Sequence, residues 1–166
     1  GGATTETYLA LGDLYASDGL SDDAIQSYQQ AVVCAPDSLD AHLRLGTLCA
    51  DAGLSEKGLA HLQRAAELAP NDYRPRYALA RFYLRASEPR RAVEAFEAAL
   101  ASAPVEPEVL FDAGMAYKTL RDYGKAADLF RRVTLVAPKN AGAYRQLAAV
   151  SALHFLDRLT ADAPDA

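Results

Sequence analysis

The chain has 166 residues, 51% of them apolar and 23% charged, and 17 Lys and Arg against 22 Asp and Glu give a net charge of −5. A chain this apolar can bury enough surface to fold, so disorder is not expected, and its deficit of basic residues speaks against a nucleic-acid partner. No uninterrupted apolar stretch reaches the roughly 18 residues of a membrane span. The 35 alanines and the lack of Trp favour closely packed helices, and we predict an all-α fold.

Four prolines recur at intervals of 34 residues: Pro36, Pro70, Pro104 and Pro138. If each proline closes a repeat, the complete repeats are residues 5–38, 39–72, 73–106 and 107–140. The remaining segment, 141–159, matches only the first half of a repeat, and we predict that it forms a capping helix. Residues 1–4 are interpreted as a leader and residues 160–166 as a flexible tail.

Eight places recur within these repeats. The first repeat fills them with Tyr8, Leu11, Gly12, Tyr15, Ala24, Tyr28, Ala31 and Pro36. The later repeats keep most of the same residue types in register. This pattern resembles the tetratricopeptide repeat (TPR) family, and the resemblance covers nearly the whole chain. It implies one array over residues 5–159, an α-solenoid of antiparallel helical hairpins wound into a right-handed superhelix.

Each repeat carries two apolar stripes at three- and four-residue spacings, which predicts two helices that pack on each other. The facing helix must come close at a small residue in each repeat: Gly12, Gly46, Ala80 and Gly114. Because neither helix can bury its stripe alone, the repeats are expected to stabilise one another by stacking.

Turn residues stand between the two stripes. In the first two repeats we expect Gly19 and Gly53 to end one helix and Ser21 and Ser55 to cap the next. Pro89 and Asp122 are expected to begin the second helices of the third and fourth repeats.

Residues with catalytic or metal-binding chemistry are scattered. Cys34 and Cys49 form no CxxC motif and are interpreted as two buried thiols in a reducing compartment. His42, His61 and His154 are too far apart in sequence to suggest a metal pair. Since no phosphate loop or hydrolase motif is present either, we predict no enzyme activity, no cofactor and no metal.

The resemblance to TPR proteins implies a concave groove lined by the first helices, which holds a peptide or helix of a partner. The predicted groove residues are Leu9, Asp13, Leu43, Thr47, Arg74, Tyr77, Arg81, Leu84, Arg85, Phe111, Met115, Lys118 and Arg145. Tyr77, Phe111 and Met115 are apolar at places that the repeat core does not require. Leu9 and Asp13 stand where one TPR subclass uses Lys and Asn to bind the acidic end of a chaperone, so that function is not expected.

Charge is distributed unevenly along the chain. The four repeats carry −6, −2, +2 and +2, and residues 141–166 carry −1. Apolar groove residues beside basic ones in the third and fourth repeats favour an amphipathic partner segment with apolar anchors and acidic flanks.

The sequence therefore predicts a non-catalytic scaffold or adaptor, which by analogy of fold serves in the assembly of a bacterial multiprotein machine. Two alternatives stay open. The chain is a recruiting or regulatory segment of a larger enzyme, or it self-associates through the apolar capping helix, which carries Val150, Leu153, Phe155 and Leu156. The cytoplasm is the expected location, with a periplasmic or membrane-anchored parent protein left open.

Overall fold

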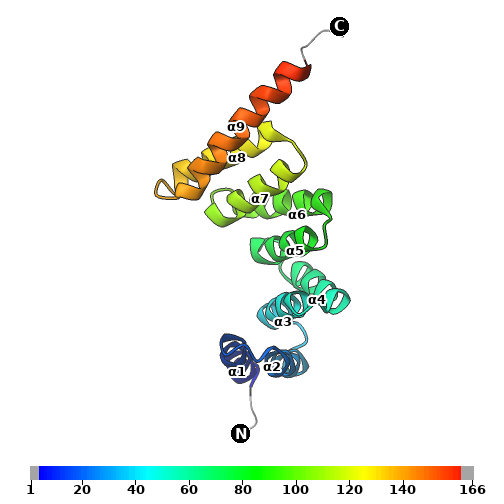
Figure 1. The fold of residues 1–166 in the computed structure, drawn as a ribbon. Helices are drawn as coiled ribbons and strands as arrows, with labels where there is room; N and C mark the ends of the chain where they lie inside the picture. The colour runs from blue at the N-terminus through cyan, green and yellow to red at the C-terminus, as the bar shows by residue number, and fades with distance from the viewer. Residues whose placement is uncertain (1–3, 162–166) are drawn as a thin grey trace. The chain divides into compact units, whose positions relative to one another are not determined.

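A computed structural model describes residues 4–161, and all regular elements in this range are α-helices, as predicted (Figure 1). The helices are α1 (Thr5–Ser17), α2 (Ser21–Cys34), α3 (Leu39–Asp51), α4 (Ser55–Leu68), α5 (Tyr73–Arg85), α6 (Pro89–Ser102), α7 (Pro107–Thr119), α8 (Tyr123–Val136) and α9 (Ala141–Ala161). The chain divides between Phe82 and Tyr83, within α5, into two compact units.

In unit 1 each helix packs on the next, α1 on α2, α2 on α3 and α3 on α4 (Figure 1). The apolar core of this unit joins α2 to α3 through the buried side chains of Tyr28, Leu45 and Cys49. Leu9 and Tyr15 of α1 pack against this cluster. One core thus ties the first hairpin to the second.

In unit 2 the same sequential packing joins α6 to α7, α7 to α8 and α8 to α9 (Figure 1). Phe96, Leu110 and Phe130 of α6, α7 and α8 are fully buried. Val150 of α9 is also fully buried, so one apolar side of this last helix packs on the fold.

The two helices of a hairpin approach closely at the predicted glycines. A Cβ atom added to Gly46 would lie 2.9 Å from the backbone nitrogen of Leu62 in α4. At Gly12 the added atom would overlap the ring of Tyr28, and at Gly114 it would lie 2.9 Å from the ring of Phe130. No room for a side chain is left at these three places, so glycine sets the distance between the helices.

The turn after each first helix passes through the left-handed region of backbone conformation. The residues concerned are Gly19 (φ 76°), Gly53 (φ 80°), Ser87 (φ 59°) and Arg121 (φ 60°). The expectation for Gly19 and Gly53 is confirmed, whereas the third and fourth repeats reach the same conformation without glycine.

The predicted serine caps are wrong, because Ser21 and Ser55 are the first residues inside α2 and α4 and the preceding leucines, Leu20 and Leu54, make no side-chain cap. Backbone bonds close these turns instead, as where the N–H of Leu20 donates to the carbonyl of Tyr15 at 2.9 Å. In α8 the expected cap is present, since Asp122 accepts from the N–H of Lys125 at 3.1 Å.

Both ends of the array differ from the predicted boundaries. Thr4, assigned to the leader, caps α1 by accepting from the N–H of Thr7 at 3.4 Å. At the other end α9 continues through Thr160 and Ala161, two residues past Leu159, and the Thr160 hydroxyl donates to the carbonyl of Asp157 at 2.9 Å. The rest of the predicted leader and tail, residues 1–3 and 162–166, lies outside the described residues.

Replacing Arg121 with glycine is predicted to stabilise the protein. A non-glycine residue in the left-handed region costs roughly 1–2 kcal/mol, and the greater freedom of glycine in the unfolded chain offsets part of this gain. We expect the free energy of unfolding to rise by about 1 kcal/mol in urea titrations of Arg121→Gly. Gly53→Ala is the matched control and should lower the stability. A loss of stability in Arg121→Gly would contradict the prediction.

Candidate partner-binding surface of the first helices

A shallow pocket of about 290 Å³ lies over the first hairpin of unit 1 and α3. It is lined by Ala16, Tyr28, Leu43, Arg44, Thr47, Leu48 and Asp51. The pocket brings together Leu43 and Thr47, two of the predicted groove residues, and both are half-buried. Arg44 and Leu48 were missed, because they stand at neighbouring places of the same helix that the family pattern does not assign to the groove.

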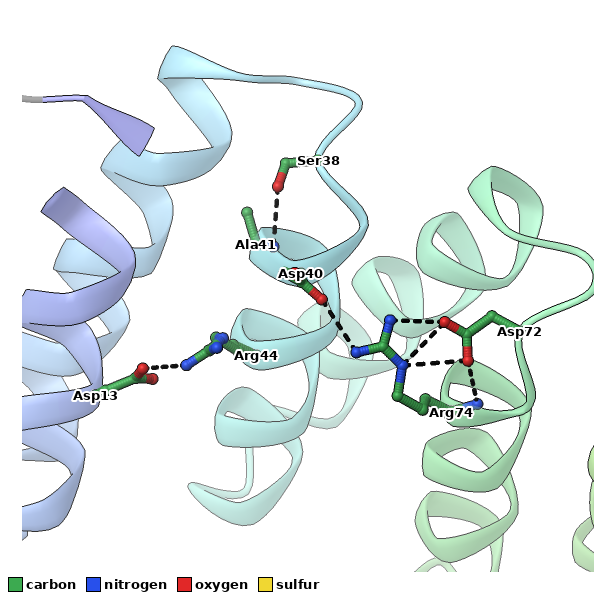
Figure 2. Close-up of polar contacts among 7 residues, drawn as sticks. All are labelled: Asp13, Ser38, Asp40, Ala41, Arg44, Asp72 and Arg74. Atoms are coloured by element: carbon green, nitrogen blue, oxygen red, sulfur yellow. Dashed lines mark hydrogen bonds and ion pairs between the residues drawn. The ribbon is translucent and has the colours of Figure 1, made fainter. Parts of the chain in front are cut away.

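Asp13, another predicted groove residue, is held by two side chains of other helices. The Tyr28 hydroxyl donates to Asp13 Oδ1 at 2.7 Å. The Arg44 guanidinium donates to Asp13 Oδ2 (Figure 2). Burial alone would raise the pKa of Asp13, but the hydrogen bonds from Arg44 and Tyr28 outweigh it and the pKa is lowered. Burial and the Asp13 bond raise the pKa of Tyr28 to about 12. Asp13 thus links α1 to α2 and α3.

Arg74, predicted as a groove cation, lies between two carboxylates of this chain. Its Nη2 donates to Asp72 Oδ2 at 2.7 Å, and its Nη1 donates to Asp40 Oδ1 at 3.3 Å (Figure 2). The hydrogen bond from Arg74 lowers the pKa of Asp72. An acidic partner would have to compete with both carboxylates for this guanidinium.

Arg81 and Tyr77 form a second cationic feature of unit 1. The guanidinium carbon of Arg81 lies 5.8 Å from the centre of the Tyr77 ring, which is within range of a cation–π contact. Tyr77 is half-buried and Arg81 is exposed. Leu9, at the far end of the predicted set, is half-buried against the core cluster.

In unit 2 two predicted groove residues, Phe111 and Lys118, contact side chains of neighbouring helices. Phe111 is half-buried and packs edge-on against Phe130, with the ring centres 5.4 Å apart. This contact adds to the packing between α7 and α8 and leaves Phe111 only part of its side chain for a partner. Lys118 donates to the side chain of Gln146 in α9 at 2.9 Å.

The other predicted residues of unit 2 differ in exposure. Leu84 and Met115 are half-buried, whereas Arg85 and Arg145 are exposed. The structure thus places one cation on α5 and one on α9 where they are accessible to solvent.

Two histidines that seemed unrelated in sequence are in contact. The Nδ1 atoms of His42 and His61 are 3.0 Å apart, and His42 Nε2 donates to the carbonyl of Pro36 at 2.9 Å. Their distance in sequence did not predict this contact, which forms because the hairpin brings the fourth place of the repeat opposite the second helix. A carbonyl can only accept, so neutral His42 accepts at Nδ1 from the Nδ1–H of His61.

The two cysteines also differ from each other. Cys49 is buried, as predicted, and burial raises the pKa of its thiol. Cys34, at the end of α2, is exposed, so the interpretation of both as buried residues is wrong for this one. Within residues 4–161 no group of three or more His, Cys, Asp or Glu side chains has the arrangement of a metal site. No helix in the described part of the chain is long and apolar enough to cross a membrane.

Two stretches of the chain, residues 9–73 and 77–143, match the sequence model of the tetratricopeptide repeat. The chain belongs to the tetratricopeptide repeat family. A search of the curated proteins gave no significant match.

Solved structures of TPR type share the fold. A crystal structure of MamA is 22% identical, has a TM-score of 0.80 and is aligned over 92% of this chain and 83% of its own. MamA from Desulfovibrio magneticus RS-1, residue 41 to the end, is 16% identical with a TM-score of 0.81, over 97% of this chain and 91% of its own. YrrB, described as a TPR protein with an unusual peptide-binding site, is 21% identical with a TM-score of 0.72. The alignment covers 85% of this chain and 73% of YrrB. At these identities the likeness shows an α-solenoid fold and nothing more specific.

The stability of this TPR protein is predicted to fall in mild acid because of the histidine pair. One proton on His61 leaves the bond to His42 intact, but a second would set two N–H donors against each other. Burial, and secondarily the proximity of His42, lower the pKa of His61. The folded state therefore binds fewer protons than the unfolded chain, and stability present above the ordinary histidine pKa of about 6.5 is lost as the pH falls below it.

The measurement is the free energy of unfolding in urea between pH 8 and 5, for the wild type and His61→Gln. We expect a shallower pH dependence in His61→Gln. Identical slopes would show that the pair carries no proton linkage.

Proposed function

We propose that this chain is a non-catalytic protein-interaction module, a scaffold or adaptor that holds a segment of a partner against its first helices. The observation that carries the proposal is the pocket over the first hairpin and α3, which exposes Leu43 and Thr47 beside the charged side chains of Arg44 and Asp51. Membership of the TPR family supports it, as does the similarity to YrrB, which is described as having a peptide-binding site. A concave, partly apolar site with few polar groups is typical of ligand recognition.

The chemistry of the surface indicates the partner. The pocket has room for an apolar side chain, and the Asp13–Arg44 ion pair beside it leaves little net charge there. Arg81 is exposed in the same unit. An amphipathic segment with apolar anchors and acidic flanks suits these groups.

The cellular setting is proposed from one exposed thiol and from the fold. The exposed thiol of Cys34 suits a reducing compartment such as the cytoplasm. A role in assembling a bacterial multiprotein machine is proposed by analogy of fold alone. The proposal does not depend on either point.

The test uses a phage-displayed library of random peptides selected on the wild-type chain. We expect enrichment of peptides with an apolar residue flanked by Asp or Glu. Thr47→Arg places a charged side chain in the pocket and should weaken the enriched peptides at least about tenfold, or about 1.4 kcal/mol.

Gln63→Arg is the matched control, since it adds the same charge at an exposed residue of α4 that does not line the pocket. Circular dichroism would show that both variants keep their helices. Peptides that bind Thr47→Arg as tightly as the wild type would exclude the pocket, and a library without enrichment would contradict the proposed function.

A further inference from the structure

One face of α9 is apolar and uncovered. Tyr144, Ala148, Ser151, Phe155 and Leu159 follow each other at three- and four-residue spacings and therefore share one side of the helix. The side chains of Tyr144, Phe155 and Leu159 are 49%, 64% and 54% exposed. The opposite side is already used, because α9 packs on α8 and its residues Ala143 and Val150 are fully buried.

The equivalent face is covered in the complete hairpins. In α3 the places of Tyr144, Ala148 and Ser151 hold His42, Gly46 and Cys49, all buried. Leu62 of α4 lies directly over Gly46. The rings of Tyr28 and Phe130 lie in the same way over α1 and α7. The exposed face of α9 is thus the first half of a hairpin whose second half is not among residues 141–161.

A turn that would let a second helix fold back is missing from this segment. The other first helices are 13 residues long, and α1, α3 and α7 are followed by the left-handed residues Gly19, Gly53 and Arg121. The 21-residue α9 continues as helix through the corresponding place, which is Phe155. A helix that covers this face therefore does not arrive through the tight turn of a further repeat.

We propose that this face of α9 binds a helix of a partner protein, packed as a second TPR helix packs on its first helix. The partner helix carries a large, mainly apolar residue between two small ones. In α2 this arrangement is formed by Tyr28 between Ala24 and Ala31. The reason is shape: Ala148 and Ser151 form a low stretch between the aromatic residues Tyr144 and Phe155. Ser151 stands where α1 and α7 have tyrosine, so space is left for a large side chain.

Charge beside the face indicates an acidic flank on the partner. A pocket of about 320 Å³ between α8 and α9 adjoins it and is lined by Arg131, His154 and Arg158, together with Ser151 and Phe155. Asp128 also lines the pocket and already pairs with Arg131 at 2.6 Å. Arg158 is exposed, and an Asp or Glu of the partner helix would meet it there. None of these residues belongs to the predicted groove, so this proposal does not rest on the proposed function.

The probe is a fluorescent peptide with the sequence of residues 20–36, the segment that contains α2. A lactam between Asp22 and a lysine introduced as Gln26→Lys keeps it helical, and both places are exposed in the native hairpin. Titration with the full chain, followed by fluorescence anisotropy, should give saturable binding. A peptide with Tyr28→Ser should bind at least about tenfold more weakly, because it lacks the large central residue.

Two variants of the chain locate the binding face. Ser151→Arg should weaken the peptide at least about tenfold, whereas Thr160→Arg, which adds the same charge on the other side of α9, should leave its affinity unchanged. The proposal would be overturned if the peptide showed no saturable binding to the wild type. It would also be overturned if Ser151→Arg bound the peptide as tightly as the wild type does, which would show that the peptide replaces α2. A dimeric wild type with a monomeric Ser151→Arg in sedimentation would assign the face to a second copy and would also overturn it.

Discussion

The close approach of two helices at a glycine is the contact on which the rest of this structure depends. Gly46 lets the backbone of α4 come within van der Waals distance of α3, and Gly12 and Gly114 receive aromatic rings in the same way. Because α1, α3 and α7 each pack on their second helix on this side, and α3, α7 and α9 pack on the preceding helix on another side, only a limited set of places remains for partners. The surface chemistry follows from the packing of the hairpins.

The packing of the helices determines which charged and apolar side chains remain available to a partner. In unit 1, Asp13 and Arg74 join neighbouring first helices through bonds to Arg44 and Asp40 (Figure 2). These exposed pairs add little stability, but they neutralise charges that the sequence alone assigns to a partner. What remains in unit 1 is a partly apolar pocket and, on α5, the exposed guanidinium of Arg81. On α9 one apolar face is not covered by any helix in the described part of the chain.

The repeat pattern predicted the helices and their order because it depends on local spacing. Thr5, Leu39 and Tyr73 begin both a 34-residue repeat and a helix. The pattern could not predict contacts that depend on side-chain conformation across a hairpin. The bond from Arg44 to Asp13 spans 31 residues, and the contact of His42 with His61 spans 19. The edge-on contact of Phe111 with Phe130 is of the same kind. In each case the sequence shows both residues but does not predict that they are in contact.

The most direct test of this account is the stability of Gly46→Ala in urea. Helix propensity alone predicts a gain of about 1 kcal/mol, because alanine is the better helix former. The structure predicts the opposite sign, since the new Cβ would lie 2.9 Å from the backbone nitrogen of Leu62, which cannot move without separating α3 from α4. We expect the free energy of unfolding to fall by about 1–3 kcal/mol, the usual cost of overpacking. A variant as stable as the wild type, or more stable, would contradict the claim that glycine sets the packing of the hairpins.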